Sequence, residues 1–130
     1  MAIPPTLTVV ADDLTPPYEQ LRRQLTQAIG SGILRPGERL PPLRQLASDL
    51  GLAVGTVART YRELEAAGLI RTRRGGGTRV ADRPPMLSDD RRRQLLDEYA
   101  ATYVSHAHLL GADDDAIVVA VQQALAALLR

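Results

Sequence analysis

The chain has 130 residues, of which 45% are hydrophobic, so it can pack one domain of ordinary size and is too apolar for wholesale disorder. It contains no cysteine, which excludes disulfides, thiolate nucleophiles and cysteine-based zinc sites. The formal net charge is only +1, but all sixteen basic residues are arginine and they are unevenly distributed.

The middle of the chain is basic and the remainder is acidic. Nine arginines stand against four acidic residues from Arg35 to Arg79, and four arginines against seven acidic residues from Pro84 onward. This layout predicts that a polyanionic partner binds the middle, with a solvated basic surface as the alternative. The first ten residues lack the pattern of a secretory signal, and no segment is apolar enough to cross a membrane, so we expect a cytoplasmic chain with no membrane partner.

The first predicted helix begins near residue 15, where Thr15 is suited to cap it, and ends at Gly30 and Gly32. Its apolar residues recur at helical spacing: Leu14, Tyr18, Leu21, Leu25, Ala28 and Ile29. The Pro36-Gly37 pair that follows predicts a type II turn.

Two further helices are predicted with only a short break between them. The first is LRQLASDL, residues 43 to 50, with Gly51 placed for a left-handed cap. The second is TVARTYRELEAA, residues 56 to 67, for which Thr56 can act as the cap. Its buried stripe is Val57, Tyr61 and Leu64, and its opposite side carries Thr56, Arg59 and Arg62.

A β-hairpin is predicted next, from two short runs joined by Gly75, Gly76 and Gly77. A phosphate-binding P-loop is poorly supported, because the glycines lack a following Gly-Lys-Ser/Thr and lead into a strand. Two helices, a tight turn, a helix and a hairpin predict a winged helix-turn-helix domain over residues 12–82. In that domain the glycine tip approaches a sugar-phosphate surface, and arginines supply charged contacts: Arg73, Arg74 and Arg79.

Residues 83–130 are predicted to form a two-helix dimerisation tail, which makes the fold class mainly α (α+β). The first tail helix, residues 88 to 110, has a seam with coiled-coil spacing: Leu96, Tyr99, Tyr103, His106 and Leu110. The second, residues 113 to 130, is capped by Asp113 and apolar on nearly every side, including Ile117, Val121, Leu125 and Leu128. One neighbouring helix cannot cover such a surface, so we expect a homodimer.

No catalytic or metal site is predicted. His106 and His108 are two residues apart and therefore point to different faces of a helix, so we expect no metal and no cofactor. No set of nucleophile, base and orienting residue is present, so we do not expect an enzyme. The run Arg91-Arg92-Arg93 is either a further phosphate-binding patch or a solvated helix start.

Residues 16 to 80 resemble the GntR family of bacterial transcription regulators. The combined order of motifs carries the resemblance: GILRPGERLP, then LRQLA, then TVARTYRELEAAGLI, then RGGGT. The short tail is similar to the YtrA-type subgroup, in which two helices replace a larger effector domain and the protein is a homodimer. The resemblance implies a sequence-specific regulator, expected to be a repressor, which binds a palindromic operator in double-stranded DNA.

The resemblance also implies roles for particular residues. Arg44 would contact the operator, Thr56 and Arg59 would meet base edges and phosphates, and the wing would use Gly75, Gly77 and Thr78. The chain departs from the family where polar residues usually stand, because it has Ala53, Val54, Gly55 and Ala58, and Pro42 where a serine is common. A winged-helix module that binds protein instead of DNA is the alternative function, and any small-molecule effector is unknown.

Overall fold

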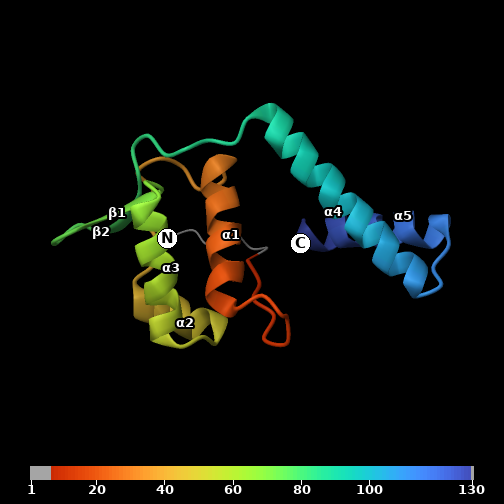
Figure 1. Cartoon of the computed structure of the whole chain (residues 1–130), viewed down its shortest axis with the longest axis horizontal. Coiled ribbons are helices and arrows are strands. Elements are labelled where there is room, and N and C mark those ends of the chain that lie inside the picture. Colours follow the sequence, from red (N-terminus) through yellow and green to blue (C-terminus); the bar gives the residue numbers. More distant parts are fainter. Residues whose placement is uncertain (1–6, 130) are drawn as a thin grey trace. The chain divides into compact units, whose positions relative to one another are not determined.

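The computed structural model describes residues 7–129. Residues 1–6 and 130 lie outside the described part. Two predictions fall partly on them: that the first ten residues lack a secretory signal, and that the last helix extends to residue 130. The elements in chain order are α1 (Pro17–Gly30), α2 (Leu43–Leu50), α3 (Val54–Ala66), β1 (Ile70–Arg73), β2 (Gly77–Val80), α4 (Asp89–Leu109) and α5 (Asp114–Leu128) (Figure 1). The chain divides into two compact units between Leu87 and Ser88.

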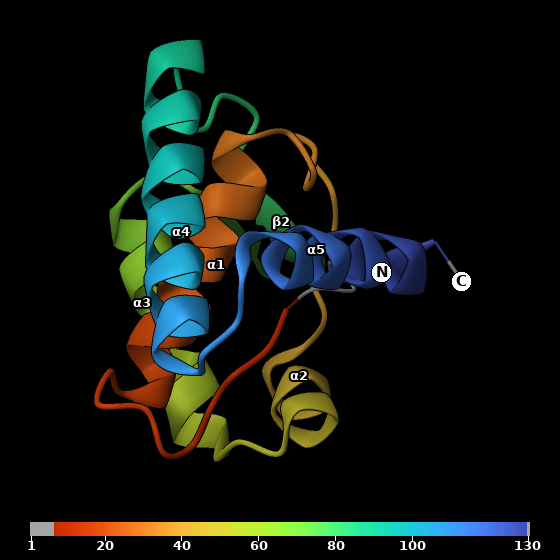
Figure 2. The same cartoon turned by 90° about the vertical axis from the view of Figure 1, so that its right-hand side faces the viewer.

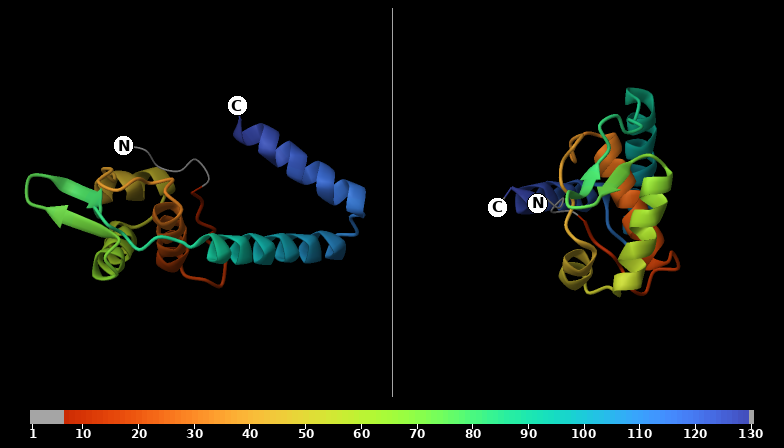
Figure 3. Two further views of the ribbon diagram at one scale, coloured as in Figure 1. Left: turned by 90° about the horizontal axis from the view of Figure 1, so that it is seen from above. Right: turned by 90° about the vertical axis from the view of Figure 1, so that its left-hand side faces the viewer.

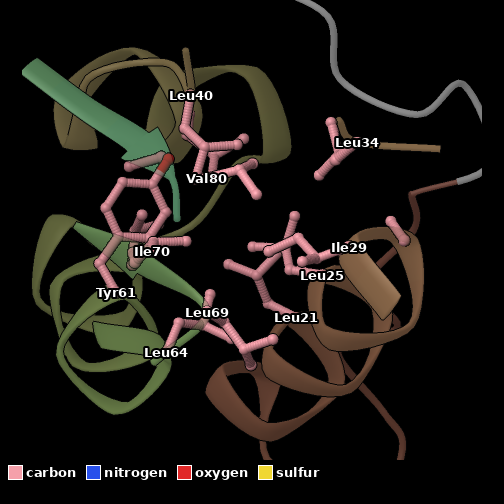
Figure 4. Packing of buried hydrophobic residues seen from close by; sticks show 14 residues of the cluster. Leu21, Leu25, Ile29, Leu34, Leu40, Tyr61, Leu64, Leu69, Ile70 and Val80 are labelled. Carbon is pink, nitrogen blue, oxygen red and sulfur yellow. The ribbon is translucent and has the colours of Figure 1, made fainter. Parts of the chain in front are cut away.

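The first unit is a three-helix domain with a β-hairpin. Helices α1 and α3 lie side by side, and α2 crosses near one end of them (Figures 1 and 2). One hydrophobic cluster fills the space between the helices and the hairpin (Figure 4): Leu21, Leu25, Ala28, Ile29, Leu34, Leu40, Leu46, Ala47, Val57, Tyr61, Leu64, Leu69, Ile70 and Val80. Most of the stripe residues predicted for the first helix and all of those predicted for the third lie in this cluster. Each large side chain buried in this way contributes about 1.5–3 kcal/mol.

The start of α1 differs from the prediction. The helix begins at Pro17, and the cap position is Pro16, which makes no side-chain cap hydrogen bond, so Thr15 does not cap it. The Thr15 N–H instead donates to Asp13 Oδ1, which turns the chain before the helix. Leu14 therefore precedes the helix and is fully exposed instead of belonging to the apolar stripe.

The hairpin is antiparallel, with Ile70 opposite Val80 and Arg73 opposite Gly77. A third extended segment lies along the other edge of β2, because Arg39 forms an isolated bridge with Arg79. Its backbone is held by two hydrogen bonds of 2.8 Å, from Leu40 N–H to Thr78 O and from Val80 N–H to Glu38 O. The sheet at the base of the hairpin is thus wider than the two strands that the sequence predicts.

The turn before that segment forms as predicted. Glu38 N–H donates to Arg35 O, and Gly37, the third residue of the turn, has a φ of 78°. A positive φ at this position is what a type II turn requires, and glycine adopts it without a Cβ clash. The turn places Arg39 and Leu40 beside β2.

The chain between the two units belongs with the first unit. Pro84 is buried, and Leu87 N–H donates to Gly30 O over 2.8 Å at the end of α1. The observed division therefore falls after Leu87, later than the predicted boundary after residue 82.

The second unit is the helical pair α4 and α5. Asp113 caps α5 as predicted, because its Oδ1 accepts from Ala116 N–H. Helix α4 is capped by Ser88, whose Oγ accepts from Arg91 N–H. The two helices diverge from the connection between them (Figure 3). Within this unit the buried side chains are Ala107 and Ile117, among the residues described.

Most of the apolar residues predicted for dimerisation are exposed, from 43% for Val121 to 87% for Leu110, and they include Leu96, Tyr99, Leu125 and Leu128. Two others are used within the tail. Ile117 is buried, and Tyr103 is half-buried and donates its hydroxyl hydrogen bond to Ile117 O over 3.0 Å. Because burial of apolar surface is the main stabilising term in a fold, this tail needs a further covering surface.

Candidate nucleic-acid interface

The connection from α2 to α3 is a tight turn centred on a glycine. Gly51 has a φ of 66°, and the N–H of the following residue, Leu52, donates a hydrogen bond to Ala47 O over 2.8 Å. This left-handed cap ends α2 as predicted and lets α3 start three residues later, at Val54. The arrangement of α2, turn and α3 is that of a helix-turn-helix.

The start of α3 lies two residues before the prediction. Its cap position is Ala53, which has no side-chain hydrogen bond, so Thr56 is not the cap but a half-buried residue of the first turn. The sequence gives no signal for this start, because Ala53, Val54 and Gly55 carry no side chain that can cap a helix. The first N–H groups of a helix lack an intrahelical partner, and the residues at this start, Val54 and Gly55, are exposed.

Arg44 and Arg62 are exposed, and neither has an intramolecular ion pair within the described residues. Among the described residues, Arg62 forms no ion pair with either glutamate on α3, Glu63 or Glu65. Glu63 lies near Arg59 and Arg22 instead, at 3.5 and 3.8 Å. Arg62 therefore keeps its full charge available to a partner.

Arg59 has close contacts inside the domain. Its guanidinium carbon lies 3.6 Å from the centre of the Tyr18 ring on α1. The side chain is 52% exposed and its Nε lies 3.5 Å from Glu63 Oε1. Next to it, the buried Thr60 hydroxyl donates to Tyr18 O over 2.9 Å. Arg59 thus contributes to the packing of α3 against α1. Its contact with DNA remains a prediction.

Tyr61 is a core residue, as the stripe predicts. Its hydroxyl donates to Pro41 O over 2.8 Å, and burial raises the pKa of the phenol. The hydroxyl is therefore used within the fold.

The tip of the hairpin is a glycine turn between exposed arginines. Gly76 N–H donates to Arg73 O over 3.0 Å, and Gly75 has the positive φ, 78°, that closes this turn. The side chains of Arg73 and Arg74 are exposed and make no ion pair within residues 7–129. Thr78 faces the other way, with its hydroxyl 3.2 Å from that of Thr72.

Two of the remaining arginines near the hairpin are held by the fold. Arg71 pairs with Asp82 over 3.1 Å, and Arg79 donates to Gly37 O over 3.1 Å. Arg39, which sequence reasoning did not select, lies with its guanidinium against Gly77. The run Glu38-Arg39-Leu40 is too short for strand periodicity to reveal that it pairs with β2.

In the part of the chain that the structure describes, no cluster of three metal-binding side chains occurs. His108 Nε2 lies 3.6 Å from Asp114 Oδ1, a pair that spans the connection between α4 and α5. Within residues 7–129, no helix has both the length and the apolar character that crossing a membrane requires.

Comparison with known proteins agrees with this geometry. The family described as bacterial regulatory proteins, gntR family, matches residues 17–80. The chain is 32% identical over 99 residues to the HTH-type transcriptional repressor YtrA of Bacillus subtilis, a match that covers 76% of each chain. It is 48% identical over 66 residues to the HTH-type transcriptional regulator Rv1152 of Mycobacterium tuberculosis, where the match covers 51% of this chain and 54% of that protein.

A solved structure shows the same fold over most of the chain. The GntR-family transcription factor YtrA from Sulfolobus acidocaldarius superposes with a TM-score of 0.53 at 26% identity, covering 95% of this chain and 99% of that one. The fold is therefore a winged helix-turn-helix followed by a two-helix tail, as the sequence predicts. These relatives are regulators of transcription, not enzymes. The chain belongs to the gntR family of bacterial regulatory proteins and carries the DNA-binding domain of that family.

Proposed function

We propose that the chain is a transcriptional repressor that binds a palindromic operator as a homodimer. The observation that carries the proposal is the set of exposed arginines without ion pairs, within the described residues, on the helix-turn-helix and the hairpin tip: Arg44, Arg62, Arg73 and Arg74. Repression is supported by the name of the Bacillus subtilis relative, a transcriptional repressor.

The helix-turn-helix would supply sequence recognition. In this motif the second helix, here α3, enters the major groove with its first residues toward the bases. Arg44, Thr56, Arg59 and Arg62 are the residues that we assign to it. An arginine that bridges guanine O6 and N7 gives about 1–3 kcal/mol of discrimination between bases.

The hairpin would supply contacts that do not depend on sequence. Arg73, Arg74 and Thr78, with the bare backbone of Gly75, Gly76 and Gly77, form a wing that can approach the sugar-phosphate surface. A charged hydrogen bond from a guanidinium to a phosphate is about twice as strong as a neutral one.

A homodimer would follow from the uncovered tail. Residues Leu96, Tyr99, Leu110, Val121, Leu125 and Leu128 are exposed on α4 and α5 of a single chain. A second copy related by a two-fold axis would cover them and place two winged domains on half-sites about 34 Å apart. We assign the dimer to the cytoplasm, where a bacterial regulator meets its DNA.

The salt dependence of DNA binding separates this function from that of a protein-binding module. On a duplex selected from a random pool, the logarithm of the affinity should fall linearly with the logarithm of the salt concentration, with a slope of about −0.9 for each phosphate neutralised. Fluorescence anisotropy over a salt series measures it. A flat response, or no binding at low salt, would favour the protein-binding module.

A further inference from the structure

The outer face of the wing carries four arginines from three neighbouring segments. Ile70 and Val80 point into the core, so the residues next to them along the strands point outward. By the register of the strands and the bridge to the preceding segment, the outward residues are Arg71 and Arg73 on β1, Arg79 on β2 and Arg39 beside it. We call these four residues the outer arginine face.

Three of these arginines stand in one row across the sheet. Arg39 is opposite Arg79, and Arg79 is opposite Arg71. Side chains opposite each other in a sheet are only about 4.5–5.5 Å apart at Cβ, and like charges in such pairs destabilise it. One carboxylate among the described residues, that of Asp82, forms an ion pair with the face. The other nearby carboxylates hold backbone groups instead, since Glu38 accepts from Arg35 N–H and Glu65 from Thr72 N–H.

Within this row, the Arg39 side chain packs against Gly77. A Cβ at Gly77 would lie 3.0 Å from one terminal nitrogen of Arg39 and 3.1 Å from its Nε, so the guanidinium rests on bare backbone. Arg39 remains exposed, and no carboxylate pairs with it within residues 7–129. In Arg71, the Nε is buried and has no hydrogen-bond partner among the described residues.

We propose that the outer arginine face, with Arg39 as its main contact, binds phosphates of the DNA backbone beyond those that the wing tip and α3 reach. The proposal rests on the proposed DNA-binding function and extends its surface. A row of positive charges that repel one another is relieved by a polyanion, and planar guanidinium groups match phosphate oxygens in pairs. Arg73 belongs to both the tip and this face, so the face continues the DNA-binding surface of the wing.

The test compares the salt dependence of DNA binding for Arg39→Gln, Arg39→Lys and the unchanged chain. R39Q should make the negative slope shallower by about 0.9 on selected and scrambled duplexes alike. When the salt concentration rises fourfold, the factor by which affinity falls should therefore be about 3.5 times smaller for R39Q than for the unchanged chain. R39K keeps the charge and should keep the slope. The control is R23Q, since Arg23 is exposed on α1 and paired with Glu19, and its slope should not change.

A second variant removes a negative charge from the face and does not depend on the stability of R39Q. Asp82 is 73% exposed and pairs with Arg71, so Asp82→Asn should leave the domain folded while freeing that guanidinium. D82N should bind DNA more tightly, with a slope steeper by as much as about 0.9. Unchanged slopes in folded R39Q and in D82N would overturn the proposal, whereas failure of the unchanged chain to bind any duplex would overturn the proposed function itself.

Discussion

At the scale of single residues, several of the arginines make contacts that depend on the planar guanidinium group. Arg22 and Arg23 both donate to Glu19, and the hydrogen bond from Arg22 holds the pKa of the Glu19 carboxyl below its usual value. Arg59 stacks on Tyr18, and Arg39 lies flat on Gly77. A lysine can make none of these planar or forked contacts in the same way.

Arg59 is the residue where two roles can be separated by measurement. Arg59→Ala should reduce discrimination between a selected and a scrambled duplex by about 5- to 150-fold if the side chain also reads a base. Arg74→Ala should instead weaken binding to both duplexes about equally, because a wing contact to phosphate carries no sequence information. Competition binding with the two duplexes gives both ratios.

Arg59→Ala also tests the contact between Arg59 and the Tyr18 ring. Loss of the contact with the Tyr18 ring should lower the free energy of unfolding by about 0.5–1 kcal/mol, as for other exposed cation–π pairs, measured by denaturant unfolding. A loss of stability with unchanged discrimination between duplexes would show that Arg59 only positions α3.

At the scale of elements, the wing depends more on Gly77 than on Gly76. Gly77 has a φ of 69°, and a Cβ there would press on the Arg39 guanidinium at 3.0 Å. Gly76 has no positive φ, and its Cβ would meet Arg73 at an ordinary 3.4 Å. The three glycines that look alike in the sequence are therefore not equivalent.

Alanine substitutions test this difference. Gly77→Ala should destabilise the first unit by about 1–2 kcal/mol and weaken DNA binding, because it forces a left-handed backbone on a residue with a Cβ. Gly76→Ala is the matched control and should change either quantity by less than about 0.5 kcal/mol. Thermal unfolding measures the stability of both variants, and fluorescence anisotropy measures their DNA binding. Equal effects of the two substitutions would contradict the difference between Gly77 and Gly76.

The elements themselves could largely be predicted from the sequence, because apolar spacing and glycine caps act locally. The stripe of α3 and the left-handed cap at Gly51 were confirmed. Helix starts without a capping side chain, at Pro16 and Ala53, could not be located, since their signals are absent. The position of Arg39 could not be predicted either, because it depends on pairing with a strand distant in the sequence.

At the scale of the whole molecule, the tail explains why the proposed function needs two chains. One chain leaves Leu125 and its neighbours on α5 exposed, and each winged domain alone offers only a few free arginines. Joining two domains makes the second binding event intramolecular, which raises affinity by about 10²- to 10⁴-fold without any new contact. Dimerisation and operator binding should therefore be lost together.

A charged substitution on α5 tests that coupling. Leu125→Glu should give a monomer by sedimentation and weaken binding to a palindromic duplex by about 100-fold or more, while binding to a single half-site is little changed. Leu14→Glu is the control, because Leu14 is equally apolar and fully exposed on the first unit, and it should leave both properties unchanged. A dimer that survives L125E would place the interface elsewhere.

The most direct test of the central claim is the mass of the complex between the unchanged chain and a duplex selected from random DNA, measured by analytical ultracentrifugation. The account predicts two chains on each duplex and an inverted repeat among the selected sequences. One chain on each duplex, or a selection that yields no shared sequence, would contradict it.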